Sequence, residues 1–185
     1  MRPLMLVQAL DERDWLRAFI VRWVCELAAH VERLNVIALE VGQANLPDNV
    51  RVFSLGKERH VGRAAELANF HGSMRRAVRD ADVILSHMTP RYTLLAAPYA
   101  AIYGKRQMLW YTHRHASMQL RLALACCSRV VTAAPDSFPL SSPKVRVLGH
   151  GIDTDFYAPA RESEQSASII HVARIINSRI NPQQI

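Results

Sequence analysis

Short apolar runs alternate along the chain with longer segments in which apolar residues recur every three or four positions. The short runs are typical of strands buried in a parallel sheet. They predict strands at Leu4–Gln8, Leu34–Val41, Val50–Leu55, Val83–His87, Gln107–Thr112, Arg129–Ala133 and Lys144–Leu148. The longer segments predict helices over about Arg17–Arg33, Gly62–Asp80, a stretch after Thr89-Pro90, and Ser117–Cys127. This alternation predicts an α/β fold with a Rossmann-like, doubly wound parallel sheet.

Two residues disturb the helical pattern. Gly72 lies inside the second predicted helix, where it costs about 1 kcal/mol relative to alanine, so we expect a close contact that requires a glycine. Pro98 lies inside the third, where it is expected to kink the helix or to mark its true start. The apolar stripes of these helices include Leu67 and Ile102, which are expected to face the core.

The segment KVRVLGHGIDTDFYAP, Lys144–Pro159, combines a short strand with a connector broken by Gly149 and Gly151. This pattern suits a hinge between domains. We therefore expect a first domain over residues 1–158, a polar linker over 159–168, and the start of a second domain over 169–185 that opens with an apolar strand at Ile169–Ile176.

The same connector resembles that of retaining glycosyltransferases of family 4, which have the GT-B fold. Their pattern "nG(I/V)DtdxFxP" is matched by HGIDTDFYAP, His150–Pro159. The resemblance extends to LMLVQAL, LPDNVRVFSLGKE, ILSHMTPRY, MLWYTHRHASMQLRLA and RVVTAAPDSF. It implies the acceptor-binding N-terminal half of such an enzyme, which transfers a sugar from a UDP- or GDP-sugar to a glycan or lipid-linked acceptor without a metal or other cofactor.

Ligands of open parallel sheets bind at the carboxyl ends of the strands, so residues that follow a strand are the candidates. The resemblance places His113 beside the transferred sugar, where a neutral imidazole can donate and accept hydrogen bonds. It places Arg114 near by. A structural or capping role for His113 remains the alternative.

The segment SHMTPRY is expected to line the acceptor pocket with His87 and Arg91, and Tyr92 could stack on a sugar ring. The alternative is a plain helix entry, with Thr89 as cap and Pro90 at the first position. His150 and Asp153 complete the predicted substrate contacts.

The loop after the first strand departs from the family pattern. Many relatives carry a glycine-rich loop there, but this chain has no glycine between Met1 and Gly42. Asp14 and Trp15 are therefore expected to help define the acceptor side instead.

The donor phosphates are expected to bind Arg174 and Arg179, by the same resemblance. The family's pair of donor-binding Glu residues has no counterpart, because no acidic residue follows Glu164. We therefore expect this chain alone to neither hold a nucleotide-sugar tightly nor transfer the sugar, and a missing domain or a partner chain to supply the rest. The alternative is a non-catalytic Rossmann-like binding domain, or a degraded glycosyltransferase that acts through a partner.

Composition narrows these hypotheses only in part. The formal net charge of +7 permits binding to anionic lipid, nucleic acid or phosphorylated ligands, or a merely solvated basic surface. Nucleic acid is not expected, because Trp23, Phe70 and Tyr99 take core-like positions. The motifs GxGxxG, GxxxxGK[ST], HExxH and GxSxG are absent. The three cysteines are expected to be reduced and buried.

The sequence also bears on location. No apolar run is long enough to span a membrane, and the apolar start meets acidic residues at Asp11 and Glu12 instead of a cleavage site. A cytoplasmic protein is expected, with peripheral contact at the inner face of an anionic membrane left open.

Overall fold

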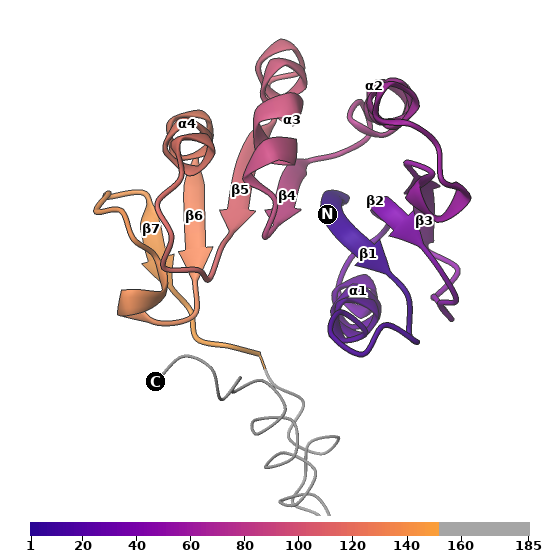
Figure 1. Cartoon of the computed structure of the whole chain (residues 1–185), viewed down its shortest axis with the longest axis horizontal. Coiled ribbons are helices and arrows are strands. Elements are labelled where there is room, and N and C mark those ends of the chain that lie inside the picture. The colour runs from indigo at the N-terminus through magenta and orange to yellow at the C-terminus, as the bar shows by residue number, and fades with distance from the viewer. Residues whose placement is uncertain (152–185) are drawn as a thin grey trace, which may run out of the picture. The chain divides into compact units, whose positions relative to one another are not determined.

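The computed structural model describes residues 1–151, and within them seven strands form one parallel sheet. The strand order is β3-β2-β1-β4-β5-β6-β7, and every neighbouring pair is parallel (Figure 1). This arrangement confirms the predicted α/β, doubly wound, Rossmann-like fold. The strands are β1 Pro3–Leu10, β2 Leu34–Val41, β3 Val50–Ser54, β4 Val83–His87, β5 Arg106–Trp110, β6 Arg129–Thr132 and β7 Val145–Val147.

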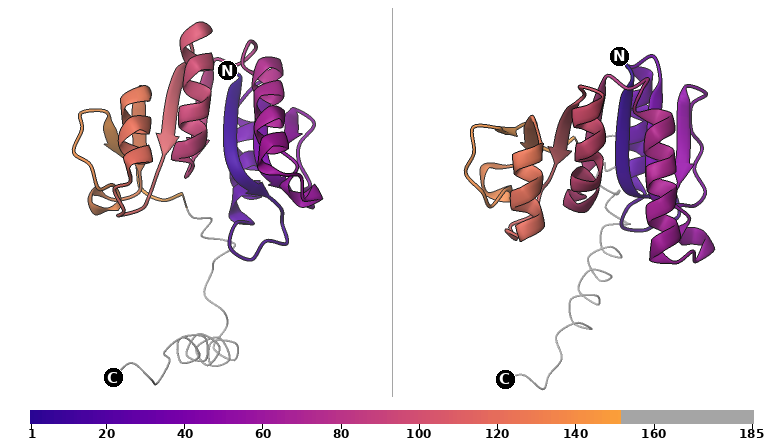
Figure 2. Two further views of the ribbon diagram at one scale, coloured as in Figure 1. Left: turned by 45° about the horizontal axis from the view of Figure 1, so that its top comes forward. Right: turned by 90° about the horizontal axis from the view of Figure 1, so that it is seen from above.

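Helices cover both faces of the sheet. Helix α1, Phe19–Ala29, lies on one face, and α2, Arg63–Ala77, α3, Pro90–Ile102, and α4, Met118–Cys126, lie on the other. Figure 2 shows α2, α3 and α4 side by side over that second face. Two short 3-10 turns, η1 Lys57–Arg59 and η2 Pro135–Ser137, follow β3 and β6.

The core has two layers that meet at β1. Alternate residues of β1 point to opposite faces, so Met5 and Val7 pack with α1, whereas Leu4 and Leu6 pack with α2 and α3. All four side chains are at most 1% exposed. This double burial explains why β1 reads as a continuous apolar run instead of an alternating one.

Several predictions about single residues were wrong. Leu67 and Ile102 are 38% and 76% exposed, because the apolar stripes of α2 and α3 are narrower than their sequences suggest. Cys126 is exposed and Cys25 is half-buried, so among the free cysteines only Cys127 is buried as predicted.

The start of α3 bears on two further predictions. The helix begins at Pro90, directly after Thr89, so Pro98 lies inside the helix and does not mark its start. Pro90 holds the first helical position, as the helix-entry alternative expects, but the side chain of Thr89 makes no capping hydrogen bond. The predicted domain boundary at 158, the linker 159–168 and the strand at 169–176 lie outside the described residues, as do Asp153, Arg174 and Arg179.

Gly72 and Gly42 differ in the space around their Cα atoms. A Cβ atom at Gly72 would meet only the Nη2 atom of Arg76, at 3.6 Å, so the expected close contact is absent. A Cβ atom at Gly42, directly after β2, would lie 2.2 Å from the carboxyl carbon of Asp11. Gly42 is thus the residue that permits a close approach.

Replacing Gly72 by alanine should raise the free energy of unfolding by about 0.5–1 kcal/mol, because the helix gains propensity and nothing is displaced. Urea unfolding followed by circular dichroism measures this change. An unchanged or lower midpoint would contradict it.

The same substitution at Gly42 should act in the opposite direction. Gly42→Ala displaces the Asp11 carboxylate, which accepts hydrogen bonds from the backbone N–H groups of Arg13 at 3.0 Å and Gln43 at 3.2 Å. We expect a loss of about 1 kcal/mol or more in the same urea experiment. Equal effects of the two substitutions would show that Asp11 does not need the space beside Gly42.

Candidate functional site at the carboxyl edge of the sheet

All carboxyl ends of the described strands lie along one edge of the sheet, because the strands are parallel. The order of strands changes direction between β1 and β4, which is where open α/β sheets place their ligands. Most predicted site residues follow a strand at this edge: Asp14, Trp15, His87, Arg91, Tyr92, His113, Arg114 and His150. The side chains do not form one cluster. They form the separate groups described next.

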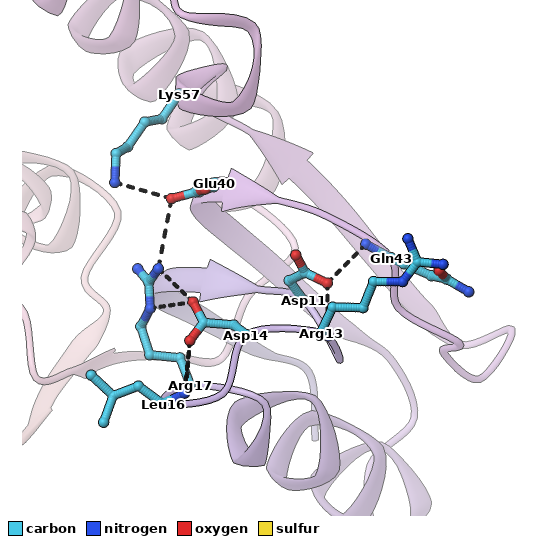
Figure 3. A network of polar contacts seen from close by, with 8 residues as sticks. All are labelled: Asp11, Arg13, Asp14, Leu16, Arg17, Glu40, Gln43 and Lys57. Carbon is cyan, nitrogen blue, oxygen red and sulfur yellow. Dashed lines mark hydrogen bonds and ion pairs between the residues drawn. The ribbon is translucent and has the colours of Figure 1, made fainter. Parts of the chain in front are cut away.

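The loop between β1 and α1 is held by Asp14 (Figure 3). Its Oδ1 atom accepts hydrogen bonds from the backbone N–H groups of Leu16 at 3.0 Å and Arg17 at 2.8 Å, and its Oδ2 atom accepts one from Nε of Arg17 at 2.7 Å. Arg17 also lies 3.8 Å from Glu40 at the end of β2, and Glu40 pairs with Lys57 of η1 at 3.0 Å. The network joins the ends of β1, β2 and β3.

Electrostatics keeps Asp14 ionised. Burial alone would raise its pKa, but the hydrogen bonds from the side chain and backbone of Arg17 and from Leu16 outweigh burial, so the pKa of Asp14 is lowered. The Asp14 carboxylate therefore accepts its hydrogen bonds from residues of its own loop. Trp15 and Leu16 beside it are 85% and 61% exposed. Of the two residues predicted at the acceptor side, Trp15 presents free surface and Asp14 acts as the anchor of its loop.

An aromatic cluster lies on the α1 side of this edge, formed by Phe19, Trp23, His87, Trp110 and His150. Trp23 is at its centre, with ring centroids 5.2 Å from His87, 5.1 Å from Trp110 and 5.8 Å from Phe19, all edge to face. The ring of His150 lies 5.9 Å from that of Trp110. Edge-to-face packing of this kind stabilises aromatic pairs beyond the burial of their area. The cluster joins α1, β4, β5 and the segment after β7.

His87 is the buried polar member of the aromatic cluster. It is 4% exposed, and within residues 1–151 its ring makes aromatic contacts but no hydrogen bond. Burial, together with the charge of His150, lowers the pKa of His87 to about 4. The imidazole is therefore neutral at pH 7, with one nitrogen able to donate a hydrogen bond and the other able to accept one.

Arg91 and Tyr92 lie on the opposite side of the sheet from His87, at the start of α3. Tyr92 stacks on Phe70 of α2 with centroids 5.5 Å apart and an angle of 16° between the rings. A shallow pocket opens here, which we call the α2–α3 pocket. It is lined by Leu55, Glu66, Leu67, Phe70, Arg91, Tyr92 and Leu95.

The α2–α3 pocket combines an apolar wall with opposite charges. Glu66 supplies carboxylate oxygens, Arg91 a guanidinium group, and Tyr92 a phenol whose pKa is raised by burial. Such a set can hydrogen-bond hydroxyl groups presented at the surface beside an apolar wall. Sequence reasoning missed Glu66, because nothing in the pattern of its own helix shows that it lines the same pocket as Arg91.

His113 and Arg114 form a third group, after β5. The Nδ1 atom of His113 accepts a hydrogen bond from the backbone N–H of His115 at 3.1 Å, which assigns the proton to Nε2. The ring is exposed and lies 6.4 Å from that of Tyr111. Arg114 pairs with Asp136 of η2. His113 can thus offer an N–H donor to a ligand, but no contact within residues 1–151 joins it to the aromatic cluster.

Met88 marks the turn between these groups and was not singled out from the sequence. It has a φ of 56°, which is uncommon outside glycine, directly after β4. Its backbone N–H donates to the carbonyl of Trp110 at 2.8 Å, and its sulfur accepts from the backbone N–H of Thr112 at 3.2 Å. These contacts tie the ends of β4 and β5 together, between His87 on one side and α3 on the other.

Residues 1–151 lack both a metal-binding cluster and a membrane-spanning helix. No group of three or more His, Cys, Asp and Glu side chains is arranged to hold a metal ion. No helix there has the length and apolar character needed to cross a membrane.

Comparison with solved structures finds likenesses at low sequence identity. Alr3699/HepE from Anabaena in complex with UDP matches with a TM-score of 0.62 at 17% identity, covering 94% of this chain and 50% of that one. Its complex with UDP-glucose matches with a TM-score of 0.60 at 15% identity, covering 92% and 50%. The apo form of the lipopolysaccharide outer core galactosyltransferase WaaB matches with a TM-score of 0.53 at 7% identity, covering 82% and 46%.

These likenesses show the fold. The domain has the Rossmann-like architecture of one half of a GT-B glycosyltransferase fold, and the chain spans about half the length of the structures that it matches. No protein-family model and no curated protein matches the sequence.

The buried state of His87 makes a prediction about pH. Its pKa is about 4 in the folded chain and ordinarily 6.5, so the unfolded chain takes up this proton first as the pH falls. The stabilisation from neutral His87 is complete above pH 6.5 and is lost as the pH falls toward 4, by about 3 kcal/mol at most. His87→Phe keeps an aromatic ring and removes the titration, so its stability should decline less steeply over this range.

Urea unfolding at pH 7, 6, 5 and about 4 measures both slopes, and the carboxylates common to both proteins cancel in the difference. His115→Gln, at an exposed histidine, should retain the slope of the unmodified chain. Parallel stability curves for His87→Phe and the unmodified chain would contradict the assignment.

Proposed function

We propose that this chain is the acceptor-binding half of a retaining, metal-independent GT-B glycosyltransferase that resembles family 4. The observation that carries the proposal is the half GT-B fold with Glu66, Arg91 and Tyr92 at the carboxyl edge, beside the change of strand order. The similar Anabaena protein binds UDP and UDP-glucose, which supports a nucleotide-sugar as the donor here.

The acceptor side is assigned to two groups of residues. Glu66, Arg91 and Tyr92 of the α2–α3 pocket would bind hydroxyl groups of a glycan or lipid-linked acceptor. His87 and His150, with Trp110 between them, would bound the opposite side of the same edge.

The donor side would depend on residues beyond position 151. Asp153 would contact substrate, and Arg174 and Arg179 would neutralise the diphosphate of a UDP- or GDP-sugar. His113 would orient the transferred sugar through its Nε2–H group. In a retaining transfer the acceptor hydroxyl attacks from the face that the diphosphate leaves, and cationic groups stabilise the charge on the leaving phosphate. No metal or other cofactor is assigned to this step.

The setting proposed for the reaction is polysaccharide biosynthesis at the cytoplasmic side of a membrane, with peripheral contact to anionic lipid. A second domain, supplied by the same reading frame or by a partner chain, would carry most donor contacts. The competing proposal is a binding domain without catalysis, or a degraded glycosyltransferase that acts through a partner.

The proposed assignment predicts that this chain binds oligosaccharide acceptors but does not bind nucleotide-sugar donors with micromolar affinity. Calorimetry of the 185-residue chain with UDP- and GDP-sugars should detect no micromolar binding. NMR titration with oligosaccharides should shift the backbone signals of Arg91, Tyr92 and His113. Arg91→Gln should weaken this binding by about fivefold or more, as expected for loss of one charged hydrogen bond, whereas Arg33→Gln, an exposed arginine after α1, should not.

Micromolar affinity for a nucleotide-sugar would refute the assignment of the donor side. Oligosaccharide shifts that avoid the carboxyl edge would refute the acceptor side. Catalysis itself is tested on the gene's full reading frame together with its neighbour, by release of nucleoside diphosphate with acceptor present. His113→Ala should lower the turnover by about tenfold or more. Acceptor binding without any turnover would favour the non-catalytic alternative.

A further inference from the structure

The positive charge of the domain is concentrated in the second half of its sequence. Residues 1–82 nearly balance, with eleven Asp and Glu against twelve Lys and Arg. From Val83 to Pro135 the sequence contains no acidic residue at all. The basic residues of that stretch are Arg91, Lys105, Arg106, Arg114, Arg121 and Arg129. The excess is therefore carried by α3, α4 and the strands that they cover.

The outer surface of α4 is unusually apolar for a helix that faces solvent. Met118 is 69% exposed and Leu122, one turn further on, is 52% exposed. Ala125 continues this line and Arg121 lies beside it, and both are exposed. The opposite side of α4 is buried through Leu120 and Ala123. The outer side of α4 therefore combines exposed aliphatic side chains with the polar Arg121 and Gln119.

Neighbouring elements extend this surface. Helix α3 packs against α4, and its C-terminal residue Ile102 is 76% exposed. Arg106 and Arg129 begin the adjacent strands β5 and β6, and both are exposed. We call the exposed surface formed by Ile102, Arg106, Met118, Arg121, Leu122 and Arg129 the α3–α4 face.

Among residues 1–151, no carboxylate forms an ion pair with the cations of the α3–α4 face. Within residues 83–151, Arg114 forms an ion pair with Asp136, and this pair lies at the carboxyl edge. Arg129 donates a hydrogen bond only to the adjacent carbonyl of Ser128, at 3.0 Å. A surface of aliphatic side chains flanked by uncompensated arginines suits a partner that offers both negative charge and an apolar layer.

We propose that the α3–α4 face is the surface by which this domain docks on the anionic phospholipid headgroups of a membrane. Aliphatic Met118 and Leu122 would enter the headgroup region, while Arg106, Arg121 and Arg129 pair with lipid phosphates. The inference deepens the proposed membrane contact and rests on the proposed function only for that setting. It does not depend on the sugar chemistry.

Repulsion between like charges disfavours a second copy of this chain as the partner of the α3–α4 face. A two-fold contact sets the same patch of both subunits face to face, so it would oppose like charges of Arg121 and its neighbours without any carboxylate on the α3–α4 face to offset them. Nucleic acid is disfavoured by the aliphatic side chains, since single strands bind through stacking on aromatic rings. Lipid phosphates meet both requirements.

Docking through the α3–α4 face would leave the candidate site open. The α3–α4 face runs along the outer side of α4, from Met118 next to the carboxyl edge to Arg106 and Arg129, which begin their strands at the amino edge. None of its residues lines the α2–α3 pocket or belongs to the aromatic cluster. A lipid-linked acceptor could therefore approach the carboxyl edge while the domain stays attached.

The test is co-sedimentation of the full 185-residue chain with vesicles of phosphatidylcholine alone and of phosphatidylcholine mixed with an equal part of phosphatidylglycerol. Binding should require phosphatidylglycerol and should fall as salt screens the charges. Arg121→Gln and the double variant Met118→Gln/Leu122→Gln should each lower the partition coefficient, the double variant by about tenfold or more.

Matched controls separate this surface from the other exposed ones. Arg33→Gln removes one charge from the first half of the chain, and Trp15→Gln/Leu16→Gln removes exposed apolar groups from the β1–α1 loop. Both should retain binding. Unfolding midpoints of all variants should match that of the unmodified chain, since every substituted side chain is exposed.

Three results would overturn the proposal. The first is equal pelleting with neutral and anionic vesicles, or loss of binding only in the Trp15→Gln/Leu16→Gln variant. The second is a dimeric mass in light scattering that the Met118→Gln/Leu122→Gln variant reduces to the monomer. The third is binding to RNA that depends on Arg121 without binding to vesicles. Because no sugar enters the assay, failure here leaves the acceptor titration to judge the proposed function separately.

Discussion

The arrangement of this domain depends on the parallel pairing of β1 with a neighbour on each side. Leu4 is in register with Asn35 of β2 and with Ile84 of β4. Parallel neighbours cannot be joined by a hairpin, so the chain must cross a face of the sheet between them, and these crossings supply the helices that bury both faces of β1. The same constraint sends every strand out through one edge. The fold, its two core layers and its candidate site therefore have a common cause.

The fold could be read from the sequence because this constraint leaves a mark on it. A strand covered on both faces is mostly apolar, and β2 and β4 were predicted with the bounds that the structure shows, Leu34–Val41 and Val83–His87. Exposure was predicted less well. Helical spacing identifies a face but not its width, so Leu67 and Ile102 were placed in the core although they lie at its margins. The close contact expected at Gly72 is absent, because a helix can tolerate a glycine at a position that does not require one.

From the sequence, the position of the candidate site could be predicted only as far as the carboxyl edge of the sheet. The rule that ligands gather at carboxyl ends selects His87, Arg91 and His113 alike. It does not say to which face of the sheet each side chain turns. His87 continues the alternation of β4 toward α1, whereas the turn at Met88 carries the chain to the other face, where Arg91 and Glu66 line the α2–α3 pocket. Residues four apart in sequence thus belong to different groups. Only contacts between distant segments, such as Trp23 with Trp110, reveal this separation.

The two edges of the sheet differ in what their polar groups can do. At the carboxyl edge, charges are satisfied locally: Asp14 pairs with Arg17, Glu40 with Lys57 and Arg114 with Asp136. Such pairs fix the geometry of the loops, while His87 stays neutral and buried within the aromatic cluster. Toward the amino edge, Arg106 and Arg129 lack carboxylate partners within the described residues and lie beside aliphatic surface. Unpaired cations are weak sources of geometric selectivity but strong sources of attraction to an extended anionic surface. Under the two proposals made above, selection is therefore assigned to the carboxyl edge and attachment to the α3–α4 face.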